Sequence, residues 1–117
     1  MVTNYPEHVD LIQQCMGKLG QGIPKTMQAF GQLHQVAAAD GALSHKTKEL
    51  LALAIGVTVR CKGCIGYHVH DSLKAGASRE EILETLGVAI LMGGGPSVMY
   101  ACEAMRALEQ FEKEGVK

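Results

Sequence analysis

Two cysteines and a histidine with helical spacing are the residues of this chain most suited to chemistry. Cys61 and Cys64 form a Cys-x-x-Cys pair, and His68 follows four residues after the second cysteine. If the chain is helical from about Cys61, residues three, four and seven positions apart share one face, so both thiols and the imidazole lie in one narrow arc. A second thiol one turn away can displace an oxidised first sulfur as an intramolecular disulfide. The spacing therefore indicates thiol redox chemistry.

The surroundings of the pair favour the same chemistry. The start of a helix carries positive partial charge, which favours the thiolate, and the thiolate is the nucleophilic form of cysteine. His68 is placed to accept a proton or to stabilise the thiolate. Glu49, about three helical turns upstream of the pair, is the carboxylate that we expect to receive the proton of His68. The alternative for Glu49 is a solvated carboxylate in the first turn of a helix.

Other interpretations of the pair remain open from the residues alone. A Cys-x-x-Cys can be structural, or it can be half of a zinc site. His70 is nine residues from Cys61, about 180° around a helix, which argues against a Cys2His2 zinc site built on this helix alone. The remaining cysteines, Cys15 and Cys102, fall beside or within apolar stripes, and we expect them to be buried. His34 lies one position past such a stripe, at the expected edge of the core.

Length and composition predict one domain with an aliphatic core. The chain has 117 residues, 47% of them hydrophobic, but only 4% are aromatic and there is no Trp. A small chain this apolar is expected to bury surface by forming a homo-oligomer. The net charge of −1 provides no basic field for a polyanion, so nucleic-acid binding is not expected.

The sequence favours a cytoplasmic protein that does not enter a membrane. Its first ten residues lack the basic and apolar regions of a signal peptide. Residues 85–102 carry no charge, but the segment Gly93–Pro96 divides them into pieces that are too short to span a bilayer. In a reducing compartment, four cysteines do not form a disulfide scaffold, so a close pair there is catalytic or metal-binding.

The pattern of apolar, capping and breaking residues predicts an all-α fold of about six helices. The expected helices begin near Pro6, at Pro24, at His45, at Cys61, after Ser78 and near Pro96. The first two should face the core with amphipathic stripes, formed by Val9, Ile12, Met16 and Leu19 and by Met27, Phe30, Leu33 and Ala37. The third is apolar all round over residues 50–59 and should be buried on every side.

At these residues the chain resembles a known family. The pattern Glu-x11-Cys-x-x-Cys-x3-His, filled by Glu49, Cys61, Cys64 and His68, is similar to the core motif of the AhpD-like alkylhydroperoxidases of the carboxymuconolactone decarboxylase superfamily. The similarity covers about residues 40–105 and includes the Gly-Ala-Ser-Arg-Glu-Glu-Ile segment at 76–82. It implies a single domain of this type over residues 1–117, with an all-helical fold and a trimer or hexamer whose site lies near a subunit interface.

The resemblance also implies a role for each motif residue. Cys64 would attack the peroxide oxygen of a hydroperoxide and become a sulfenic acid, and Cys61 would resolve it to a disulfide. His68 and Glu49 would form a proton relay to Cys64. No bound cofactor and no metal are expected. An external dithiol, such as a thioredoxin or a lipoyl-type protein, would return the electrons.

Two departures from the family pattern bear on the activity. The best-known AhpD enzyme has a His directly before the second Cys, where this chain has Gly63, and the chain is shorter than that enzyme. The decarboxylase branch of the family generally lacks the Cys pair. A non-redox enzyme acting on a small carboxylated lactone, and a binding or assembly protein with a metal at the thiols, are therefore the alternative functions.

Overall fold

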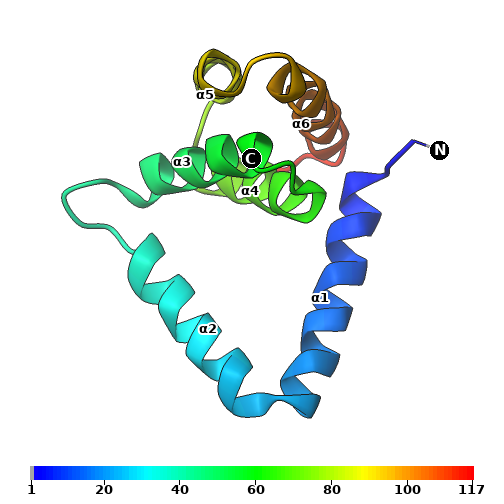
Figure 1. Ribbon diagram of the computed structural model, residues 1–117, viewed down its shortest axis with the longest axis vertical. Coiled ribbons are helices and arrows are strands. Elements are labelled where there is room, and N and C mark those ends of the chain that lie inside the picture. The colour runs from blue at the N-terminus through cyan, green and yellow to red at the C-terminus, as the bar shows by residue number, and fades with distance from the viewer. Residues whose placement is uncertain (1) are drawn as a thin grey trace.

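Six helices make up the computed structural model, which describes residues 2–117 and contains no strand among them (Figure 1). The helices are α1 (Tyr5–Gly22), α2 (Pro24–Ala38), α3 (His45–Thr58), α4 (Lys62–Lys74), α5 (Arg79–Gly93) and α6 (Gly95–Lys113). The predicted fold class and the predicted helix order are confirmed.

Side-chain caps define where several of these helices begin. Asn4 accepts the backbone N–H of Glu7 at the start of α1, and Ser44 accepts that of Thr47 at the start of α3. The predicted capping box of α5 is present, because Ser78 and Glu81 each accept a hydrogen bond from the other's backbone N–H. The backbone N–H of Ser78, followed by the ammonium of Lys46, lowers the pKa of the Glu81 carboxyl. Local sequence therefore sets these boundaries.

Helix α4 is central, since it packs against α1, α3 and α6. The core gathers around it and consists almost entirely of aliphatic and alanine side chains, as the composition predicts. Its fully or nearly fully buried members include Leu53, Val57, Ile65, Val69, Ile82, Ala104, Ala107 and Leu108. Helices α1 and α2 form a V that extends away from the other four (Figure 1).

The first turn of α1 is fastened to α6 and α4. Tyr5 is fully buried, and its hydroxyl donates to the Glu103 carboxylate at 2.6 Å. Burial and this carboxylate raise the pKa of Tyr5. The backbone N–H of Tyr5 donates to the side chain of Gln110. Gly66 of α4 lets α1 approach closely, since a Cβ there would lie 3.0 Å from Val9 and 3.1 Å from the Tyr5 ring.

The prediction that α1 and α2 bury their apolar stripes is largely wrong for the single chain. Of the stripe on α1, only Val9 is buried, while Met16 and Leu19 are exposed. Helix α2 buries no residue, and the exposed fractions of Phe30 and Leu33 are 54% and 61%. The physical reason is that α2 packs mainly on α1 and touches α3 at few points, so most of its apolar face is left uncovered by the described chain.

Two further burial predictions are corrected. The third helix is not buried on every side, since Leu51 and Ile55 project from α3 with exposed fractions of 48% and 62%. Cys15 and Cys102 are exposed rather than buried, and their side chains are free thiols. Helix α3 packs mainly against α4 and α5, whereas Leu51 and Ile55 stay largely exposed.

The charge-free stretch at 85–102 is divided as predicted, because α5 ends at Gly93 and α6 starts at Gly95. Among residues 2–117, no helix combines the length and the apolar character that crossing a bilayer requires.

The contact of α1 with α4 yields a test of the fold. Replacing Gly66 with Ala should lower the free energy of unfolding by about 1–3 kcal/mol, since the added methyl group is forced against Val9 and Tyr5. The matched control is Gly17→Ala in α1, where a Cβ would have no atom within 4 Å. This control should leave stability equal or raise it by up to about 1 kcal/mol. Urea unfolding measures both, and equal effects of the two substitutions would contradict the close contact.

Candidate functional site

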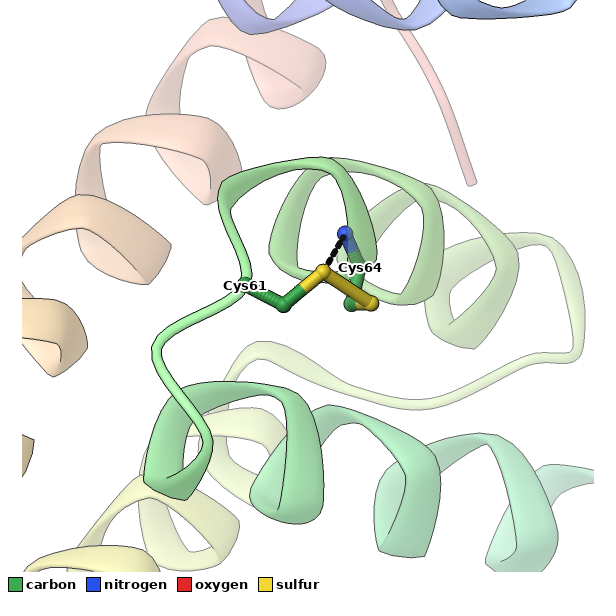
Figure 2. Close-up of a disulfide and its surroundings, with 2 residues drawn as sticks. All are labelled: Cys61 and Cys64. Carbon is green, nitrogen blue, oxygen red and sulfur yellow. Dashed lines mark hydrogen bonds between the residues drawn. A yellow bond between two sulfur atoms is a disulfide. The ribbon is translucent and has the colours of Figure 1, made fainter.

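The break between α3 and α4 places Cys61 at the start of the second helix. Arg60 adopts a left-handed conformation, with φ of 62°, and Cys61 is the N-cap residue of α4. The sulfur of Cys61 accepts the backbone N–H of Cys64 at 3.2 Å, so it fills the position that a Ser or Asn oxygen takes in other caps (Figure 2). This contact and the helix dipole both stabilise negative charge on the Cys61 sulfur.

Cys61 and Cys64 are joined by a disulfide, with 5.2 Å between their Cα atoms (Figure 2). Cys64 lies in the first turn of α4, against α3. Gly56 of α3 makes this position possible, because a Cβ at residue 56 would lie 3.1 Å from the Cβ of Cys64. The two sulfurs are therefore held together by one turn of helix, and the backbone and Cβ of Cys64 lie close to α3.

His68 and Glu49 form a buried pair next to the cysteines. His68 follows Cys64 by one turn of α4, so the two side chains leave the same face of the helix. Nδ1 of His68 lies 2.7 Å from Oε1 of Glu49. The exposed fraction of the Glu49 side chain is 3%, and that of His68 is 21%. Since Nδ1–H donates to the carboxylate, Nε2 is the nitrogen that a neutral His68 offers to another proton.

The structure adds two residues to this pair that sequence reasoning missed. His45 lies one turn before Glu49 on α3, with its Nε2 3.7 Å from Oε2 of Glu49. Asp71 lies three residues after His68 on α4, and its carboxylate is within 4.8 Å of ligand atoms of both Glu49 and His68. Their spacing from Glu49 and His68, four and three residues, is the signal that could have identified them.

A cavity of about 290 Å³ opens beside the pair, between α2 and the helices α3 and α4. Glu49, His68 and His34 contribute polar groups to its lining, and the rest is mostly apolar: Phe30, Leu33, Ala37, Ala38 and Ala52, with Lys48. His34 is exposed on α2 rather than placed at the edge of the core. Larger hollows of about 590 and 380 Å³ lie at the C-terminal end of α6 and contain none of the predicted site residues.

Two other residues of α4 face neighbouring helices, His70 toward α6 and Gly63 toward α1. The ring of His70 packs on Phe111, and its Nδ1 contacts Asp71. The space in front of Gly63 is occupied by Ile12 of α1, because a Cβ at residue 63 would lie 2.9 Å from Cδ1 of Ile12. The packing of Ile12 thus explains why a glycine suits position 63, where the best-known AhpD enzyme has a histidine.

Comparison with known proteins agrees with this architecture. A model of the carboxymuconolactone decarboxylase family matches residues 24–107. An uncharacterised protein of Cupriavidus necator is 38% identical over 105 residues, which cover 90% of this chain and 93% of the relative. A protein of Paracoccus denitrificans, known as uncharacterised protein 4 in the cox locus, is 37% identical over 84 residues, or 72% of this chain and 76% of the relative.

Two solved structures share the fold. A carboxymuconolactone decarboxylase family protein from Legionella pneumophila is 48% identical, with a TM-score of 0.89 over 92% of this chain and 96% of its own. A member of the same family from Thermotoga maritima, with a suggested role in an antioxidative response, is 32% identical. Its TM-score is 0.82 over 95% of this chain and 97% of its own.

The contact between His68 and Glu49 should be visible as thermodynamic coupling. In a double-mutant cycle, His68→Gln and Glu49→Gln should deviate from additivity by about 1–3 kcal/mol in unfolding free energy, because each substitution removes the other's buried partner. Combining Glu49→Gln with His70→Gln is the control, and this pair should be additive within about 0.5 kcal/mol. Denaturant unfolding at neutral pH measures both cycles. Additivity in the first cycle would show that the pair contributes no specific interaction.

Proposed function

Because the chain belongs to the carboxymuconolactone decarboxylase family, and because it carries a disulfide-forming cysteine pair, we propose that it is a thiol-dependent hydroperoxide reductase of the AhpD-like type. One observation carries the proposal. A bonded Cys61–Cys64 pair begins the same helix that presents His68, one turn later, to the buried carboxylate of Glu49. A nucleophile, a second thiol and an oriented base are thus combined in one place.

In the first step the Cys64 thiolate attacks the terminal oxygen of the hydroperoxide, and the O–O bond breaks. The sulfur is oxidised to a sulfenic acid, while the substrate leaves as an alcohol after taking up one proton. His68 takes the thiol proton of Cys64 before the attack and passes it to the departing oxygen. Glu49 accepts the hydrogen bond from Nδ1 of His68, which orients the ring and stabilises its positive charge.

In the second step the Cys61 thiolate attacks the sulfenic sulfur of Cys64. A disulfide forms, and the hydroxyl group leaves as water with the proton that the Cys61 thiol gave up when it became the thiolate. The N-cap position of Cys61 supports this step, since the N–H of Cys64 and the helix dipole both stabilise negative charge on the reduced sulfur. An external dithiol then reduces the disulfide and is itself oxidised to a disulfide. We expect a thioredoxin or a lipoyl-type protein in this role.

Two further observations support the proposal. The cavity beside Glu49 and His68 has a mostly apolar wall, which suits the carbon portion of an organic hydroperoxide. The Thermotoga maritima relative has a suggested antioxidative role, which is the same kind of activity. Lactone chemistry, the alternative within the family, would make no use of the cysteine pair.

Replacing Cys64 with Ser should abolish the activity. With an excess of a small dithiol, peroxide consumption by Cys64→Ser should fall about 100-fold or more, because the nucleophile is lost. Without the dithiol, Cys61→Ser should react once and accumulate a sulfenic acid that a dimedone-type probe labels at Cys64. Peroxide loss can be followed by a colorimetric assay, and the label by mass spectrometry of the alkylated protein.

Cys15→Ser is the matched control, since Cys15 is a free thiol on α1. Its peroxide consumption should equal that of the parent protein. Unchanged consumption by Cys64→Ser would contradict the proposal. Turnover of a carboxylated lactone by a protein that lacks both Cys61 and Cys64 would instead establish the decarboxylase activity.

We also propose that copies of this chain associate as a homo-oligomer, a trimer or a hexamer as in the family that it resembles. Exposed apolar side chains support this proposal. Exposed fractions are 79% for Leu91, 77% for Met92 and 71% for Val36, and α2 buries none of its residues. Large exposed apolar side chains of this kind are typical of an interface.

The substitution Phe30→Asp tests this association, because it places a charge on the exposed apolar face of α2. Sedimentation should show the parent above the 12.5 kDa of one chain and Phe30→Asp shifted toward that mass. Gln28→Asp, which adds the same charge on the polar side of α2, should sediment as the parent does. A parent protein that sediments as one chain at micromolar concentration would rule out the oligomer.

A further inference from the structure

Four side chains with metal-binding atoms converge from two facing helices. Glu49 from α3 and His68 and Asp71 from α4 offer ligand atoms that all lie within 4.8 Å of one another. His45, one turn before Glu49, adds an imidazole nitrogen 3.7 Å from the second oxygen of the same carboxylate. Glu49, His68 and Asp71 thus face one point between the helices, and His45 extends the cluster on the Glu49 side.

The hydrogen bond of His45 leaves its other ring nitrogen suited to bind a cation. Nδ1 of His45 lies 2.7 Å from the backbone oxygen of Ala38, and a carbonyl oxygen only accepts, so Nδ1 carries a proton. In the neutral ring, Nε2 then has a lone pair, and it faces Oε2 of Glu49 at a separation too long for a hydrogen bond. Two facing lone pairs attract a positively charged species between them.

The outer contacts of the cluster resemble those that orient metal ligands. A ligating histidine usually donates its other N–H to a backbone carbonyl or a carboxylate, as His45 does to Ala38. Asp71 is held in the same way, since one of its oxygens contacts Nδ1 of His70 at 2.9 Å and the other stays free. Glu49 is almost fully buried, whereas the exposed fractions are 31% for Asp71 and 42% for His45. An ion could therefore enter from the His45 side.

We propose that Glu49, His68, Asp71 and His45 bind one divalent transition-metal ion of the zinc class. Mixed imidazole and carboxylate donors favour Zn²⁺ or Co²⁺ over Mg²⁺ or Ca²⁺, which take oxygen ligands. Ligand atoms around tetrahedral Zn²⁺ are about 3.4 Å apart, so small side-chain rotations bring these donors together. The site uses no thiol, but it shares Glu49 and His68 with the relay proposed above, so a bound ion would replace their hydrogen bond and slow the peroxide chemistry.

The test uses the disulfide form of a Cys15→Ser, Cys102→Ser protein, in which no free thiol competes for the metal. Isothermal titration with Zn²⁺ should give one ion per chain. Titration with Co²⁺ should produce visible d–d absorption without a sulfur charge-transfer band. Asp71→Asn and His45→Gln should each weaken Zn²⁺ binding by about 10-fold or more, since each removes one ligand.

Glu109→Gln serves as the matched control, because Glu109 is an exposed carboxylate on α6 that lines a hollow containing none of the cluster residues. It should bind Zn²⁺ as tightly as the parent. Circular dichroism should show that Asp71→Asn and His45→Gln stay folded. The proposal would be overturned by no Zn²⁺ binding to the folded disulfide form, or by binding that both ligand substitutions leave unchanged.

Discussion

The buried carboxylate of Glu49 is the constraint on which the arrangement of the site depends. With 3% of its side chain exposed, Glu49 must find partners, since removing the partner of a buried charge costs about 3–5 kcal/mol. Its main partner, His68, comes from the neighbouring helix, so the pair fixes how α3 and α4 lie against each other. That register also brings Cys64, one turn before His68, against Gly56. One polar contact thus positions His68, Cys64 and the contact of Cys64 with Gly56 together.

The break between α3 and α4 is the second feature that positions the site, because it places Cys61 at the start of a helix. A continuous helix would leave the Cys61 sulfur on a helical face, where no backbone N–H is free to reach it. Because Arg60 turns the chain into the left-handed region, Cys61 becomes the first residue of a new helix, and its sulfur accepts the N–H of Cys64. The same sulfur therefore serves as a cap of the fold and as a candidate reactive group.

The sequence was sufficient to predict the helices and the members of the pair, but not the faces that become buried. The helix boundaries were predictable because the residues that set them form hydrogen bonds only three or four positions away along the chain. These residues are Asn4, Ser44, Ser78 and Gly94. The contact of His68 with Glu49 followed from a motif, whereas its neighbours His45 and Asp71 were missed although their helical spacing was available. Cys15 and the face of Phe30 were predicted to be buried and are exposed. An apolar stripe identifies the side that seeks a partner, not whether that partner belongs to the same chain.

This distinction separates two parts of the candidate site. The polar part lies between α3 and α4, which pack against each other and against the core, so its geometry is set within one chain. The apolar wall of the cavity comes from α2, which buries none of its own residues. A helix without tertiary burial gains little stability from propensity alone, so we expect the proposed association of copies to hold the wall. The chemistry of the site is then fixed by the fold of the chain, while the shape available to a substrate depends on how α2 is covered.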